Sequence, residues 1–207
     1  YSPALLEERV ETLKDDHQQL IDRLSATWTA FDDLRRDAAG ADADNVRRRF
    51  LDAIIDGVWS ICEESFWGVP AHLPKTAEYS GLMDVSAPFV DLFAAETGTY
   101  LAWVDYFLGD KLDAVSPQIR KRIYYETNNR LFKPLMTIPH GWMTTNSNGR
   151  APNNWNPWIC SNWLNTALLL EKNDQQRADM IVKIVKVLDE FLNPYPEDGG
   201  CDEGPSY

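Results

Sequence analysis

The sequence predicts an all-α protein made of antiparallel helical hairpins. Apolar residues recur every three or four positions through most of the 207 residues, which is the spacing of one face of an α-helix. Ser, Asp and Pro stand where helices would begin, and no segment rises above this background with the alternation of a strand. Short and long connections alternate between the expected helices. The hairpins should therefore stack, and such hairpins can form part of an incomplete (α/α) toroid with its long loops at one end.

Two helices are expected in the first third of the chain. The first follows Ser2-Pro3, and the second is expected to be capped by Asp44. Their apolar faces are formed by Leu5, Leu6, Val10, Leu13, Leu20, Ile21 and Leu24 in the first helix, and by Phe50, Leu51, Ile54, Ile55, Val58, Trp59 and Cys62 in the second. A loop rich in Gly, Pro and aromatic residues is expected from about 66 to 84.

The third and fourth helices are expected on either side of residue 115. The Ser-Ala-Pro sequence at 86–88 should open the third helix, and Gly109 should end it, because glycine often terminates a helix. Ser116-Pro117 is a combined cap and first-turn signal for the fourth helix. Proline interrupts helices, so the fourth helix should stop near Pro134.

The last two helices follow a second long loop at 139–152. The fifth helix is expected at about 155–171. Asp174 is expected to cap the sixth, which Pro194 and Pro196 should end. The whole chain is expected to form a single helical domain, 1–207.

Composition narrows the classes of function. A net charge of −12 and the lack of a basic stripe argue against nucleic-acid binding, and no apolar run is long enough to span a membrane. The three cysteines form neither a disulfide framework nor a metal-like spacing, and Cys62 and Cys160 are predicted to be buried thiols. The acidity is awkward for a site that binds a polyanion, which would require a local basic patch or a weakly charged substrate. The compartment stays open, with a periplasmic or secreted location favoured slightly over a cytoplasmic one.

The polar cluster at 153–158, with the sequence Asn-Asn-Trp-Asn-Pro-Trp, opens the fifth helix. Asn153 or Asn154 could simply cap this helix, which explains one amide but not the whole cluster. An asparagine amide could instead donate hydrogen bonds to a substrate carboxylate and make the neighbouring C–H more acidic. The indoles beside it could stack on sugar rings. The cluster therefore favours a site for an acidic sugar.

Tyr207 ends a glycine-rich segment, 198–207, that could aim its phenol from a rigid turn. A free phenol titrates near about 10, so a tyrosine base would need cationic or hydrogen-bonding neighbours. The chain stops on this tyrosine without the features of a natural end, so we expect it to be a fragment.

The sequence supports histidine, metal and hydrolase chemistry less well. His140 precedes the asparagine cluster and could be a general acid or a purely structural residue. His17 and His72 show no feature of a site, and three histidines so scattered do not predict a metal centre, so no cofactor is expected. Asp198 or Glu203 could serve as one acid of a hydrolase, but no second acid is evident.

The chain resembles the N-terminal helical region of the heparinase II/III-like polysaccharide lyases. The resemblance is carried by the helical hairpins, by the 153–158 segment, and by the Asp-Gly-x-x-x-Glu-Gly-Pro-Ser-Tyr turn at 198–207. It implies an incomplete (α/α) toroid followed by a β-sandwich domain that lies beyond this chain. It also implies cleavage of uronate-containing polysaccharides by β-elimination without a catalytic metal.

The resemblance assigns roles to individual residues. Tyr207 would be the base that also protonates the leaving oxygen, and Asn153 or Asn154 would neutralise the C5 carboxylate, with Asn154 preferred. In the lyase hypothesis, His140 or Arg150 would assist by charge. Some relatives have a histidine beside the residue that neutralises the carboxylate. This sequence has an asparagine there, so the identity of the residue that acts as the acid stays open. The expected substrate-binding residues are Trp155, Trp158, Trp142, Asn156, Arg150 and Glu203.

Three hypotheses follow. The leading one is a polysaccharide lyase acting on an acidic polysaccharide. The alternatives are a glycoside hydrolase on the same toroid and a non-catalytic helical module that binds carbohydrate.

Overall fold

A computed structural model describes residues 22, 29, 43–73 and 82–200, and over these residues it contains helices and no strands. The all-α prediction is confirmed. The expected first helix lies outside the described residues. The helices are α2 (Ala43–Glu63), the 3-10 turn η1 (Pro70–His72), α3 (Leu92–Val115), α4 (Pro117–Thr127), the π-helix η2 (Asn128–Phe132), α5 (Lys133–Thr137), α6 (Trp155–Leu170) and α7 (Asp174–Leu192).

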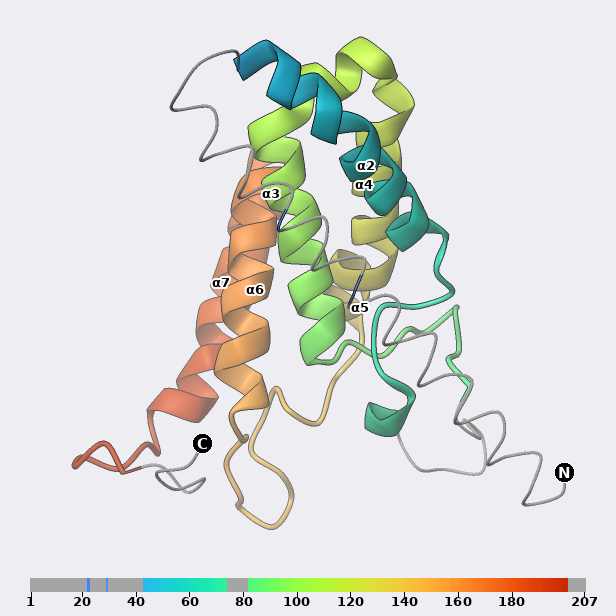
Figure 1. Cartoon of the computed structure of the whole chain (residues 1–207). Helices are drawn as coiled ribbons and strands as arrows, with labels where there is room; N and C mark the ends of the chain where they lie inside the picture. Colours follow the sequence, from blue (N-terminus) through green and yellow to red (C-terminus); the bar gives the residue numbers. More distant parts are fainter. Residues whose placement is uncertain (1–21, 23–28, 30–42, 74–81, 201–207) are drawn as a thin grey trace, which may run out of the picture.

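The helices are arranged as hairpins. α3 and α6 run in one direction, and the α4–α5 run and α7 return in the other (Figure 1). α3 packs most extensively on α6, α6 packs on α7, and α3 also packs on α4. The long connections before α3 and before α6 consequently lie at the same end of the molecule, which we call the loop end (Figure 1).

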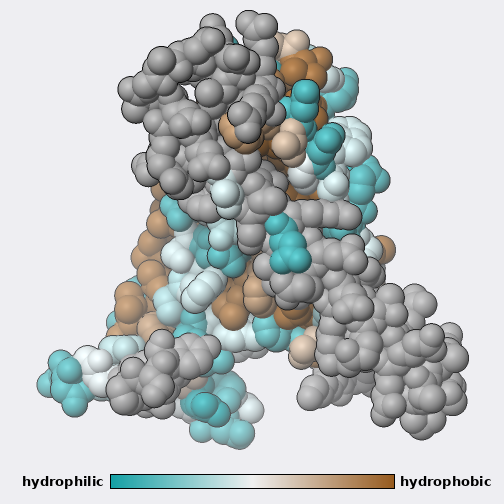
Figure 2. All heavy atoms as spheres, viewed as in Figure 1, coloured by the Kyte–Doolittle hydropathy of each residue, from teal (hydrophilic) through white to brown (hydrophobic). Residues whose placement is uncertain are grey.

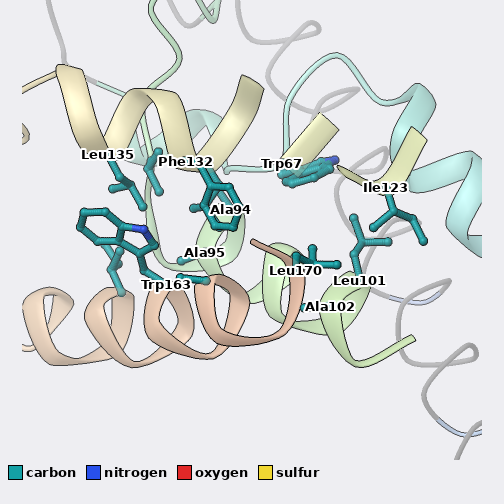
Figure 3. Close-up of a cluster of buried hydrophobic side chains, with 14 of the residues drawn as sticks. Trp67, Ala94, Ala95, Leu101, Ala102, Ile123, Phe132, Leu135, Trp163 and Leu170 are labelled. Carbon is teal, nitrogen blue, oxygen red and sulfur yellow. The ribbon is translucent and has the colours of Figure 1, made fainter. Parts of the chain in front are cut away.

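Buried side chains from α3, α4, α5 and α6 meet in one apolar core (Figure 3). Trp163 of α6 and Trp67 of the connection after α2 are among its largest members, and both are almost completely buried. Burial of a large apolar side chain contributes roughly 1.5–3 kcal/mol to the free energy of unfolding. The core therefore fixes both the helices and the start of the loop that follows α2.

The prediction for the ends of the third helix was wrong. α3 begins after Asp91, whose carboxylate accepts a hydrogen bond from the Ala94 N–H at 2.9 Å, and it continues through Gly109 to Val115. Gly109 is buried, and a Cβ atom there would lie 2.9 Å from Cζ of Arg120. That glycine allows a close approach of α4 and does not terminate the helix.

The fourth helix begins as predicted but does not end at Pro134. The Ser116 hydroxyl accepts from the Gln118 N–H at 3.2 Å. Because Pro134 has no N–H, it cannot bond the carbonyl four residues earlier, and the chain forms a π-turn in which the Lys133 N–H bonds to Asn128 O. The helix then continues as α5 to Thr137.

The remaining boundaries agree more closely with the predictions. α6 spans 155–170, and α7 ends at Leu192 before Pro194. The two predicted caps lie inside their helices. Asn173, not Asp174, caps α7 by accepting from the Gln176 N–H at 2.9 Å, and Asp44 lies inside the first turn of α2.

Candidate functional site

The amino-terminal end of α6 carries an amide that the helix does not use. Asn153 performs the local capping, since its Oδ1 accepts from the Trp155 N–H at 3.3 Å and its carbonyl accepts from the Asn156 N–H at 3.0 Å. Asn154 occupies the N-cap position, and its side chain makes no capping hydrogen bond. The half-buried Asn154 side chain is thus the donor left at this helix end.

Two predicted substrate-binding residues are structural instead. Asn156 is fully buried, and its Nδ2 donates to the carbonyls of Trp142 at 3.1 Å and Val187 at 2.8 Å. Trp142 is 5% exposed, and its indole N–H donates to Val90 O at 3.0 Å. Neither side chain can face a sugar, so the substrate-binding roles predicted for them are wrong. Their hydrogen bonds attach the loop before α6, the start of α3 and α7 to one another.

The other predicted sugar-binding residues are more accessible. Trp158 is 48% exposed on the first turns of α6, and it offers a ring face for stacking. Trp155 is half-buried, and Arg150 is exposed in the preceding loop. The expected stacking surface is therefore reduced to Trp158 and the accessible part of Trp155.

His72, for which no functional role was predicted, contacts this cluster. Its ring centroid lies 4.6 Å from that of Trp155, in a tilted arrangement. Its Nδ1 lies 2.8 Å from Oδ2 of Asp91, which is almost fully buried. An ionised carboxylate can only accept, so Nδ1 is the donor in this contact, and whenever the ring is neutral Nε2 is the acceptor.

The loop that carries His72 is folded around the Asp91 carboxylate. Oδ2 of Asp91 also accepts from the Val69 N–H at 3.0 Å, and Oδ1 caps α3. A Cβ atom at Gly68 would lie 2.9 Å from Oδ1, so only glycine allows this approach. The negative charge sits at the positive end of the α3 dipole. In the sequence, Asp91 before an apolar run is a readable cap signal, but nothing links it to a histidine 19 positions earlier.

His140 is not suited to the general-acid role predicted for it. It is 4% exposed, its ring stacks on Trp142 with centroids 5.6 Å apart, and Phe89 meets its edge at 5.3 Å. Burial, assisted by the charge of Lys183, lowers the pKa of His140 to about 4. The ring is neutral near pH 7 and holds no imidazolium proton to donate, so that prediction is wrong.

Tyr207 and Glu203 lie outside the described residues, so the structure does not place them. The described part of their segment, 193–200, leaves α7 at the loop end, where α6 begins (Figure 1). Gly199 there has a φ of 72°, which is the left-handed conformation expected of that glycine. The exposed Asp198 carboxylate accepts from the Gly200 N–H at 2.9 Å.

The described cysteines offer no nucleophile. Cys62 and Cys160 are buried as predicted, and burial raises the pKa of each thiol to about 12. Within residues 43–73 and 82–200, no group of three or more His, Cys, Asp and Glu side chains could hold a metal ion. The described helices include none that is both long and apolar enough to cross a membrane.

The sequence matches no protein-family model, and no curated protein shows significant similarity to it.

Proposed function

We propose that the protein cleaves a uronate-containing polysaccharide by β-elimination. The observation that supports this best is that Asn154 and His72 are both neighbours of Trp155 at the loop end. The unused amide of Asn154 adjoins Trp155, and Trp155 contacts the imidazole that Asp91 holds. An amide donor beside an oriented base is what removal of a proton next to a carboxylate requires.

Asn154 would bind the C5 carboxylate of the uronate. The positive end of the α6 dipole favours an anion there, and the first N–H groups of α6 are already bonded within the chain. The Asn154 side chain would then supply the hydrogen bond. Withdrawal of charge from the carboxylate makes the C5 proton more acidic, and the exposed face of Trp158 could support a neighbouring sugar ring.

Two residues are candidates for the base. Tyr207 is the base that the family resemblance implies. His72 is the second candidate, because Asp91 fixes its tautomer with Nε2 as a proton acceptor. In the reaction the base takes the C5 proton, the C4–O bond breaks, a C4–C5 double bond forms, and the leaving oxygen takes up a proton.

Incubation of the full-length protein with heparan sulfate, chondroitin sulfate, hyaluronan and alginate tests the proposal. We expect ultraviolet absorbance from a C4–C5 unsaturated uronate with at least one polymer. Folded protein that produces no chromophore on any of them would overturn the proposal. New reducing ends without the chromophore would indicate a hydrolase, and binding without cleavage would indicate a carbohydrate-binding module.

Substitutions test the assigned residues on the polymer that is cleaved. Asn154→Ala should lower kcat/KM by about 10²–10³, the cost typical of removing one donor from a developing oxyanion. Asn165→Ala, on an exposed position of the same helix, is the matched control and should leave kcat/KM within about twofold. Comparison of Tyr207→Phe with His72→Gln identifies the base, because only loss of the base abolishes turnover while substrate binding persists.

A further inference from the structure

A cavity with a mixed polar and apolar lining lies beside the loop-end site. Its volume is about 630 Å³, and it lies between η2 and α5 on one side and the segments 65–67 and 83–89 on the other. Asn129, Arg130 and Lys133 contribute polar groups to its lining. Phe89 also lines the cavity, and its ring centroid lies 5.3 Å from that of His140 and 6.5 Å from that of Trp155. One aromatic ring therefore separates the cavity from the candidate site.

Arg130 has a buried donor that the protein leaves unsatisfied. Its Nε donates to Glu126 at 2.7 Å and its Nη2 donates to the Cys62 carbonyl at 3.2 Å, but Nη1 has no partner within the described chain. The guanidinium is also held 5.1 Å above the ring of Trp67. Buried donors are normally bonded, so Nη1 lacks a partner that it would normally have, but it is closed to solvent. The guanidinium therefore acts on the cavity through its charge.

The cavity also has an excess of positive charge. Its one lining carboxylate, Glu126, is already shared by Arg122 and Arg130, each at 2.7 Å. Lys133 is exposed, and its Nζ bonds to the neutral Oδ1 of Asn129 at 3.2 Å, with no carboxylate within ion-pair distance in the described residues. This is a local basic patch in a chain whose net charge is −12.

The π-turn explains why these groups gather there. η2 has more residues per turn than an α-helix, and it holds Asn129 and Arg130 against the cavity one turn before Lys133. Single π-turns inside helices are frequent at functional sites. Here the turn follows from Pro134, which removes the N–H that an α-helix would need.

We propose that this cavity is an anionic subsite that binds the carboxylate or sulfate of a sugar residue next to the one that is cleaved. The inference rests on the proposed function and extends it to substrate selection. Lys133, which is exposed, would bind the anion from the rim, and the Arg130 guanidinium would add a second positive charge from the wall. The acidic polymer would then be held at two places, by Asn154 and by the cavity.

Calorimetric binding of hexasaccharides from each polymer in the panel tests the subsite. The protein carries both Tyr207→Phe and His72→Gln to prevent turnover whichever residue is the base, and each hexasaccharide is used in native, desulfated and carboxyl-reduced forms. Lys133→Ala should raise Kd for the native form about fivefold, and Lys133→Glu should raise it more than tenfold. Lys121→Ala, the same charge change at an exposed position of α4, should change Kd less than twofold. If the Lys133 substitutions no longer change Kd for the desulfated form, the cavity binds a sulfate. If they no longer change Kd for the carboxyl-reduced form, it binds a carboxylate.

Arg130→Gln should raise Kd about fivefold, because the wall of the cavity then loses its positive charge. If the Arg130 variant unfolds, the Kd values of the Lys133 variants alone test the subsite. Equal Kd values for the Lys133 and Lys121 variants would overturn the subsite, even if the polymer is cleaved. Lys133-dependent binding without cleavage would overturn the lyase proposal and leave the subsite standing. Neither binding nor cleavage would overturn both.

Discussion

Several side chains at the loop end depend on a single buried carboxylate. Asp91 caps α3, bonds the loop at Val69 and holds the ring of His72. A buried carboxylate is stable only when its oxygens are bonded, and here three donors surround it. The position of His72 beside Trp155 is thus set by the same group that starts α3, so the candidate site and the helix should fold together.

His140 makes stability depend on pH. Burial lowers the pKa of His140 to about 4 in the folded protein, whereas an unfolded histidine titrates near 6.5. Between these values the unfolded chain binds a proton that the folded chain does not. The free energy of unfolding should therefore fall as the pH falls from about 6.5 to 4, by on the order of 3 kcal/mol from this residue.

Urea unfolding of wild type and His140→Phe at pH 7 and pH 4.5 measures this contribution. The variant should lose about 2 kcal/mol less stability than wild type on acidification. Any constant cost of the larger ring cancels, because the pH-induced change is compared within each protein. The same loss in both proteins would contradict the assignment of a buried neutral ring.

At the scale of elements, α3 approaches η2 closely at Gly98. A Cβ atom there would lie 2.6 Å from Cδ2 of Leu131, and both residues are buried. Gly98→Ala would normally stabilise a helix by about 1 kcal/mol, because alanine has the higher helix propensity. At this crossing the clash should reverse the sign and lower the free energy of unfolding by about 1–3 kcal/mol.

A double-mutant cycle tests this contact. Leu131→Ala removes the atom that the new methyl group would meet, so Gly98→Ala should cost less than about 0.5 kcal/mol in that background. Strictly additive effects of the two substitutions would show that the α3–η2 contact is not the cause. The cavity described above depends on the same crossing, since η2 forms one of its walls.

At the scale of the whole molecule, charge is distributed unevenly. The chain carries a net charge of −12, whereas Arg130 and Lys133 form a positive rim beside the loop end. Apolar side chains are exposed both at the cavity, where Val85 and Tyr125 line it, and elsewhere. Figure 2 shows such side chains along the edge formed by α6 and α7, where Leu168, Val182 and Val185 are about half exposed.

Sodium chloride should therefore affect stability and binding in opposite directions. Between 50 and 500 mM, screening of self-repulsion should raise the free energy of unfolding by roughly 0.5–1 kcal/mol. Over the same range, the affinity for acidic hexasaccharides should fall, because the attraction to Arg130 and Lys133 is screened. Thermal unfolding and calorimetry measure the two trends. A Tm that decreases with salt would contradict the role of net charge.

The sequence determined the helical framework because the signals for helices are local. Ser116-Pro117 starts α4, the apolar positions follow the period of α2, and α6 lies where its pattern predicts. The errors arose where a distant contact changed the meaning of a residue. Gly109 fits under Arg120 and does not end α3, and Pro134 produces a π-turn without ending the helix.

Only the tertiary structure decided which polar groups meet. Asn154 and Asn156 are neighbours with the same side chain, yet one remains unused at a helix end and the other is buried between Trp142 and Val187. The environment of a side chain depends on segments far away in the chain, which local periodicity does not encode. For that reason the sequence pointed to the start of α6, whereas the pairing of His72 with Asp91 and the charge around Arg130 emerged only when the helices packed.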